Sequence, residues 1–73
     1  MPLYLITRDG VRVCHRRSAS PDIAISEQLH EEYFGRLTCM ATDVVIAPRA
    51  AERTVVISKR GAATYLAVLD DDL

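Results

Sequence analysis

The sequence predicts a small α+β domain in which one amphipathic helix packs on an antiparallel sheet. Three observations support this class. Two β-favouring runs flank Asp9-Gly10, a capped helical segment follows over residues 19–35, and three further apolar runs complete a ββαβββ order. Helices gathered on one face of an antiparallel sheet are typical of this class.

The length and composition indicate one globular unit. With 73 residues, we expect residues 1–69 to form a single domain and residues 70–73 to form a solvated acidic tail. The apolar fraction of 49% and the charged fraction of 26% argue against disorder. A domain this small buries only roughly 60% of the surface that its unfolded chain exposes, so a disulfide, a metal or a partner subunit commonly adds stability.

The first two runs, residues 3–8 and 11–17, predict a hairpin. Asp-Gly favours a type I′ turn because both central positions of that turn need positive φ. With a two-residue loop, Tyr4 is expected to face His15, and Ile6 to face Val13. The same register places three residues of the second strand together on the other face of the hairpin: Arg12, Cys14 and Arg16.

The third element is a helix of about 14 residues. Ser20 is a favourable N-cap, Pro21 suits the first helical position, and Gly35 is placed to end the helix. The residues expected to face inward are Ala24, Ile25, Leu29 and Tyr33, and those expected to face outward are Glu27, His30 and Glu31.

The second half of the chain predicts three more extended segments. Residues 36–42 fit either an extended lead-in or a short strand. Residues 44–47 predict a strand closed by Pro48, followed by a loop over residues 48–53 with room for one helical turn. A second hairpin is expected from residues 54–59 and 63–69 around Arg60-Gly61, with its register left open.

Two of these runs are apolar at successive positions, Val44-Val45-Ile46 and Val55-Val56-Ile57. Strands of that kind favour burial on both faces, and one short helix can cover only one. We therefore expect the sheet to curl over itself, or a second copy or a partner to cover the remaining face.

The charge pattern identifies a group of basic residues as the candidate binding set. The basic residues concentrate in the predicted strands and the acidic residues in the helix and tail, and eight of the nine basic residues are arginine. Arginine offers planar, bidentate donors suited to interfaces and phosphates. The set is Arg12, Arg16, Arg17, Arg49, Arg53, Lys59 and Arg60. The competing interpretation is that the basic strands pair with the acidic helix inside the chain.

Residue types that often carry chemistry do not form a recognised motif. Cys14 and His15 are adjacent in a strand and so point to opposite faces. Together with His30 and Cys39 they lack the close paired spacing of a zinc site, and a disulfide between the two cysteines is disfavoured in a reducing compartment. We therefore expect no catalytic set, no metal and no cofactor.

The pattern favours a non-enzymatic protein-interaction module, cytoplasmic and homodimeric, that acts as a regulator, inhibitor or accessory protein by occluding a site on a larger protein. Phage- and plasmid-encoded accessory proteins include chains of this size. The alternative is a nucleic-acid-binding regulator that uses an Arg-rich strand face, although the net charge of −1 is unlike the basic balance of most such modules. No apolar run reaches the roughly 20 residues of a membrane span, and no signal peptide is predicted.

Overall fold

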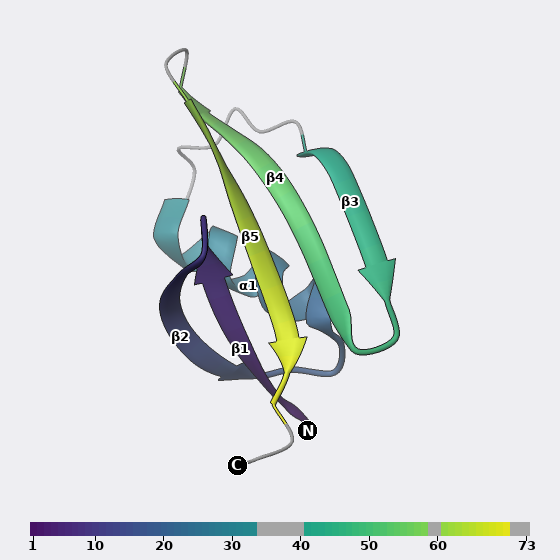
Figure 1. The fold of residues 1–73 in the computed structure, drawn as a ribbon. Coiled ribbons are helices and arrows are strands. Elements are labelled where there is room, and N and C mark those ends of the chain that lie inside the picture. The colour runs from purple at the N-terminus through teal and green to yellow at the C-terminus, as the bar shows by residue number, and fades with distance from the viewer. Residues whose placement is uncertain (34–40, 59–60, 71–73) are drawn as a thin grey trace.

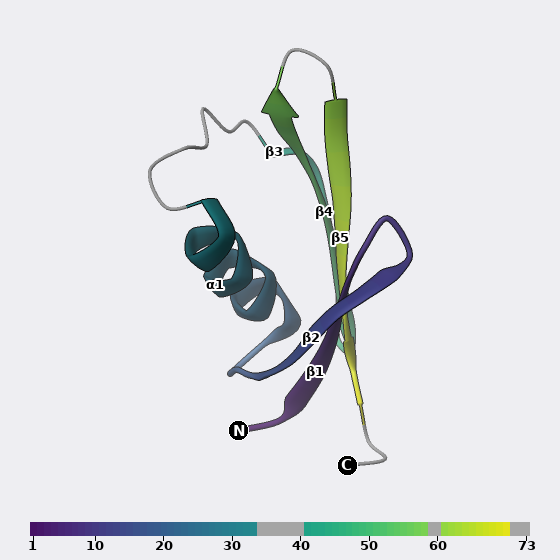
Figure 2. The same cartoon turned by 90° about the vertical axis from the view of Figure 1, so that its left-hand side faces the viewer.

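The computed structural model describes residues 1–33, 41–58 and 61–70, with the backbone alone at 41–46, 57 and 58. It confirms the α+β class. The elements are β1 (Leu3–Arg8), β2 (Val11–Arg17), α1 (Pro21–Tyr33), β3 (Ala41–Ala47), β4 (Ala50–Ser58) and β5 (Gly61–Leu69). The strands form one antiparallel sheet in the order β2-β1-β5-β4-β3 (Figure 1). Helix α1 lies against one face of this sheet (Figure 2).

The first hairpin turns as the sequence predicts. Asp9 and Gly10 have φ values of 50° and 82°, the positive pair of a type I′ turn, and Arg8 pairs with Val11 across it. Two bonds of 2.9 Å fasten the turn to β5: the amide of Asp9 donates to the carbonyl of Thr64, and the amide of Thr64 donates to the Asp9 carboxylate.

The predicted register of this hairpin is wrong beyond the turn. A β-bulge makes Val13 an extra residue, so that Arg12 pairs with Thr7 whereas Cys14 pairs with Ile6. Tyr4 then faces Arg16 in place of His15, and Leu5 faces His15. A one-residue shift exchanges the two faces of a strand. Cys14 and Arg16 therefore join Tyr4 and Ile6 on the helix side, while Arg12 stays on the opposite side.

Helix α1 begins where the capping signals predict. The hydroxyl of Ser20 accepts a 3.2 Å bond from the amide of Ile23, and Pro21 is the first helical residue. The predicted inward residues Ala24, Ile25 and Leu29 are buried. The three predicted outward residues are exposed: Glu27, His30 and Glu31. The predicted terminator Gly35 lies outside the described residues.

The core lies between α1 and the strands that it covers. Buried residues come from β1 (Tyr4 and Ile6), α1 (Ala24, Ile25 and Leu29), β4 (Ala51 and Val55) and β5 (Ala63, Tyr65 and Ala67). Tyr65 is the largest fully buried side chain. Its alternate neighbours on β5 are both alanines, and these small side chains leave room for the tyrosine ring beneath the helix.

The predicted loop over residues 48–53 is wrong. Ala47 pairs directly with Ala50 across the two-residue turn Pro48-Arg49, so residues 50–53 belong to β4. Ala and Glu have weak strand preference, but β4 is paired on both sides, with β3 and with β5, and these ladders override that preference. The carbonyl of Arg49 also accepts a 2.9 Å bond from the amide of Leu69, which ties the turn to β5.

Two further boundaries differ from the prediction. Strand β3 begins at Ala41, so the described end of the segment 36–42 is strand, and residues 36–40 lie outside the described residues. Strand β5 begins at Gly61, which pairs with Ser58, so Gly61 is a strand residue and not part of the turn. Residues 59–60, where that turn was also predicted, are outside the described part of the chain.

Gly10→Ala should destabilise the domain by about 1–2 kcal/mol, because a Cβ disfavours the left-handed φ of 82°. Gly61→Ala is the matched control. Gly61 has no positive φ and open space around its Cα, so the change should be neutral or slightly stabilising. Urea unfolding monitored by circular dichroism measures both, and equal effects at the two positions would contradict the assigned turn.

Candidate functional site

The face of the sheet that α1 leaves uncovered is the candidate site. On β5, Ala63, Tyr65 and Ala67 are buried toward the helix, so the alternate residues Leu66 and Val68 point the other way. Val68 is 40% exposed, and Val56 on β4 is 39% exposed. No element in the described part of the chain covers this side (Figures 1 and 2). We call it the open face.

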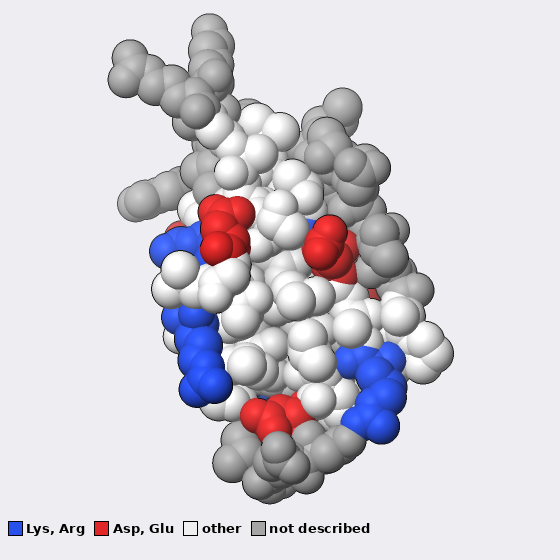
Figure 3. Space-filling model, viewed as in Figure 1, with Lys and Arg blue, Asp and Glu red and all other residues white. Residues whose placement is uncertain are grey.

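Cross-strand pairing arranges the open face in rows. One row runs across four strands as Arg12, Thr7, Leu66 and Glu52. The row beside it runs as His15, Leu5, Val68 and Ala50. On β1 and β5 the first row places Thr7 and Leu66, and the second row places Leu5 and Val68, so three of these four side chains are apolar. Figure 3 looks onto this face and shows an uncharged centre bordered by basic and acidic groups.

The structure divides the predicted basic set between the two faces. Arg12 and Arg17 lie on the open face of β2, and Arg49 lies in the β3–β4 turn; all three are exposed. Arg16 and Arg53 are turned toward the helix. The expectation that Arg12 and Arg16 share a face is therefore wrong, because the bulge at Val13 separates them. The other two members, Lys59 and Arg60, lie outside the described residues.

Three strand arginines pair with acidic residues of α1, as the competing interpretation of the charge pattern expects. Arg53 lies 2.7 Å from the carboxylate of Asp22, Arg16 pairs with Glu31, and Arg8 lies 3.7 Å from Glu32. Arg53 and Arg16 are only 21% and 23% exposed. These contacts hold the helix on the sheet. Their arginines are paired within the chain and so are less suited to binding a partner.

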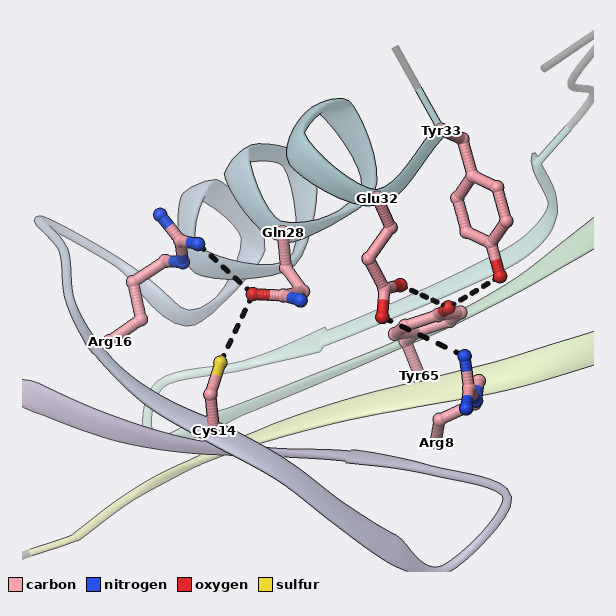
Figure 4. A network of polar contacts seen from close by, with 7 residues as sticks. All are labelled: Arg8, Cys14, Arg16, Gln28, Glu32, Tyr33 and Tyr65. Atoms are coloured by element: carbon pink, nitrogen blue, oxygen red, sulfur yellow. Dashed lines mark hydrogen bonds and ion pairs between the residues drawn. The ribbon is translucent and has the colours of Figure 1, made fainter. Parts of the chain in front are cut away.

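A polar cluster under the C-terminal half of α1 was not anticipated from the sequence (Figure 4). The hydroxyl of Tyr65 donates to Glu32 at 2.5 Å and lies 2.9 Å from the hydroxyl of Tyr33. Burial, followed by the bond to Glu32, raises the pKa of Tyr65 well above its ordinary value. The phenol is therefore a fixed neutral donor, and the cluster fastens α1 to β5. Most buried tyrosine hydroxyls find a hydrogen-bond partner, and this tendency is the only signal for the cluster that the sequence carried.

The second polar cluster in Figure 4 involves Cys14, a free thiol. Its Sγ donates to Gln28 Oε1 at 3.0 Å, and Arg16 donates to the same oxygen at 3.0 Å. Burial raises the pKa of Cys14, so the thiol stays protonated near neutral pH and is a weak nucleophile.

His15 lies on the opposite face from Cys14. Its Nε2 is 3.1 Å from the carboxylate of Asp70. This confirms that Cys14 and His15 cannot act as a pair. The backbone of Asp70 is also held to β1, since its amide donates to the Leu3 carbonyl at 2.9 Å. Residues 71–73 are outside the described part.

Neither the surface hollow beside α1 nor the described metal-ligating residue types form a convincing binding site. A surface hollow of about 640 Å³ lies beside α1 and is lined by Arg16, Ser26, Glu27, His30 and Glu31. Arg16 and Glu31 already pair there, and Glu27 accepts a 2.6 Å bond from Ser18. Among the described residues, no group of three or more His, Cys, Asp or Glu side chains is placed to hold a metal ion. Cys39 is not among them.

No known family model matches the chain, and comparison with curated proteins and with solved structures finds no match either. The one described helix is too short and too polar to cross a membrane.

Tyr65→Phe should destabilise the domain by about 1–2 kcal/mol, because it removes a buried hydroxyl that bonds to Glu32 and Tyr33. Tyr4→Phe is the matched control. Tyr4 is also buried, at 4% exposure, but its hydroxyl makes no hydrogen bond among the described residues, so the change should be near neutral. Denaturant unfolding measures both variants, and a neutral Tyr65→Phe would show that the cluster contributes nothing to stability.

The same cluster should make stability fall at alkaline pH. In the unfolded chain Tyr65 loses its proton near pH ~10, whereas the folded chain retains it because the pKa is raised. The contribution is therefore fully present below pH ~10 and is lost as the pH rises above it. The free energy of unfolding should decline more steeply above pH ~10 in the wild type than in Tyr65→Phe. Parallel declines would contradict the raised pKa.

Proposed function

We propose that this chain is a non-enzymatic protein-interaction module that binds through the open face of its sheet. The observation that carries the proposal is the exposed apolar centre of that face, where Val68 is 40% exposed beside Leu5 and Leu66. A contiguous apolar area rimmed by polar residues is typical of a protein interaction site.

The polar groups of the chain support the same proposal. The described residues of types that are common in active sites instead bond across the interface between α1 and the sheet: Cys14 with Gln28, Tyr65 with Glu32, and Arg53 with Asp22. Each is turned to the helix side and away from the open face. The open face itself offers an apolar patch and peripheral charges, which suits recognition of a protein surface better than catalysis.

The charges around the open face are mixed in sign. Arg12, Arg17 and Arg49 are exposed there, but so is Glu52. A nucleic-acid surface is ordinarily dominated by one sign and loses affinity steeply with salt. Mixed rim charges around an apolar centre favour a protein partner, and a nucleic-acid partner is tested as the alternative.

The test is a comparison of the tagged wild type with Leu66→Thr/Val68→Thr in capture from lysate of the native host, with and without nuclease. Threonine keeps the strand preference while it removes apolar contact area. The wild type should retain a specific protein, or untagged copies of itself, after nuclease treatment. The double variant should lose most of this capture, with its fold verified by circular dichroism.

Val11→Thr is the matched control, since Val11 is a 68% exposed strand valine at the hairpin tip and away from the apolar centre. It should capture as the wild type does. Capture that disappears with nuclease would support the nucleic-acid alternative. Equal capture by the double variant and the control would contradict the assignment of the open face.

A further inference from the structure

We propose that the occupant of the open face is a second copy of this chain, packed face to face about a two-fold axis that runs parallel to the strands between β1 and β5. This inference deepens the function proposed above and rests on it. Two sheets stacked in this way would form an aligned sandwich with the apolar centres in contact. The interface would be isologous, so that each contact occurs twice.

Charge complementarity selects this arrangement. The row across the open face begins with Arg12 on β2 and passes through Thr7 and Leu66 to Glu52 on β4. Beyond Glu52 it continues to the edge strand β3. The proposed axis exchanges β2 with β4 and β1 with β5. Arg12 of each copy therefore comes opposite Glu52 of the other, and two identical ion pairs flank the apolar centre.

Both charges are available for such pairing. Arg12 and Glu52 are exposed, and neither side chain makes a hydrogen bond or ion pair with any residue that the structure describes. This contrasts with Arg8, Arg16 and Arg53, which pair with the acidic helix of their own chain. Among the described residues, the fold thus leaves one cation on β2 and one anion on β4 without a side-chain partner in a single row.

A two-fold axis perpendicular to the strands is disfavoured. An in-plane axis perpendicular to the strands would place β2 of one copy over β2 of the other. Arg12 and Arg17 both lie on the open face of that strand, so the arrangement would bring arginines together. Like charges in such contact suppress association.

The shape of the first hairpin fits the proposed pairing. In Figure 2 the tip of the β1–β2 hairpin projects from the sheet on the side opposite α1. Arg12 lies two residues after Gly10 of this turn and is carried forward with the tip toward the space a second copy would occupy. Two such tips, related by the axis, would each reach along the β4 side of the other copy.

The dimensions of the chain set an upper bound on the area of the face. The principal extents of the chain are 38 × 21 × 20 Å. A face bounded by the longest extent and one of the shorter ones has an area of the order of the roughly 800 Å² that each partner buries in a standard interface.

The test is sedimentation velocity across a concentration series for the wild type, Arg12→Glu, Glu52→Arg and the double exchange Arg12→Glu/Glu52→Arg. The wild type should form a dimer. Each single variant replaces two attractive contacts with two repulsive ones and should raise the dimer dissociation constant by about tenfold or more. The double exchange restores both pairs and should return the dissociation constant close to that of the wild type.

A mixture of the two single variants gives the most specific test of the proposed ion pairs. In a mixed pair both contacts join unlike charges, so Arg12→Glu and Glu52→Arg should form a heterodimer at concentrations where each alone is monomeric. Arg17→Glu is the charge-matched control on the same strand and face. Its row contains Leu3 and does not reach Glu52, so it should weaken the dimer less than Arg12→Glu.

A wild type that is monomeric at every concentration would overturn the proposal, as would a dimer that Arg12→Glu leaves unchanged or that the double exchange fails to restore. These failures are distinguishable from failure of the proposed function. Monomeric wild type together with loss of capture in Leu66→Thr/Val68→Thr would overturn self-pairing while the open face remains a binding surface for another protein.

Discussion

The extra residue Val13 in β2 determines which side chains of this strand lie on each face of the sheet. The type I′ turn fixes Arg8 opposite Val11, and without the bulge every later residue of β2 would alternate from that point. With it, Cys14 and Arg16 turn under the helix, where both bond to Gln28. Strand β2 therefore serves both faces. Cys14 and Arg16, which follow the bulge, bond to α1, whereas Arg12, which precedes it, lies on the open face.

The division of charge follows from this geometry. The acidic residues of α1 are distributed along its length, from Asp22 in the first turn to Glu31 and Glu32 in the last. Strand arginines meet them at both ends, so the helix is held by ion pairs at its margins and by Ala24, Ile25 and Leu29 between them. Exposed ion pairs contribute little individually. The pair of Arg53 with Asp22 is partly enclosed on both sides and helps to orient the helix, whereas Glu31, the partner of Arg16, is largely exposed.

Local signals predicted the parts of the fold that depend on neighbouring residues. Asp9-Gly10 and Ser20-Pro21 are such signals, and both elements begin or turn where expected. The register of β2 was not predictable in this way, because a bulge depends on packing against a helix that comes later in the chain. The start of β4 at Ala50 was missed for a related reason, since its strand conformation comes from pairing on both sides rather than from propensity. The separation of Arg12 from Arg16 followed from the missed register of β2.

The successive apolar residues noted in the sequence favour burial on both faces of the sheet, but the fold buries only the face under α1. Val55 is completely buried under α1, whereas its neighbour Val56 is 39% exposed on the open face. A 13-residue helix cannot cover both faces of a five-stranded sheet. A domain of this size has a small hydrophobic core and is therefore only marginally stable. Any partner that binds only the folded form through the open face also stabilises the domain, by an amount that grows with the concentration of the partner. Binding and folding are therefore linked through the same surface.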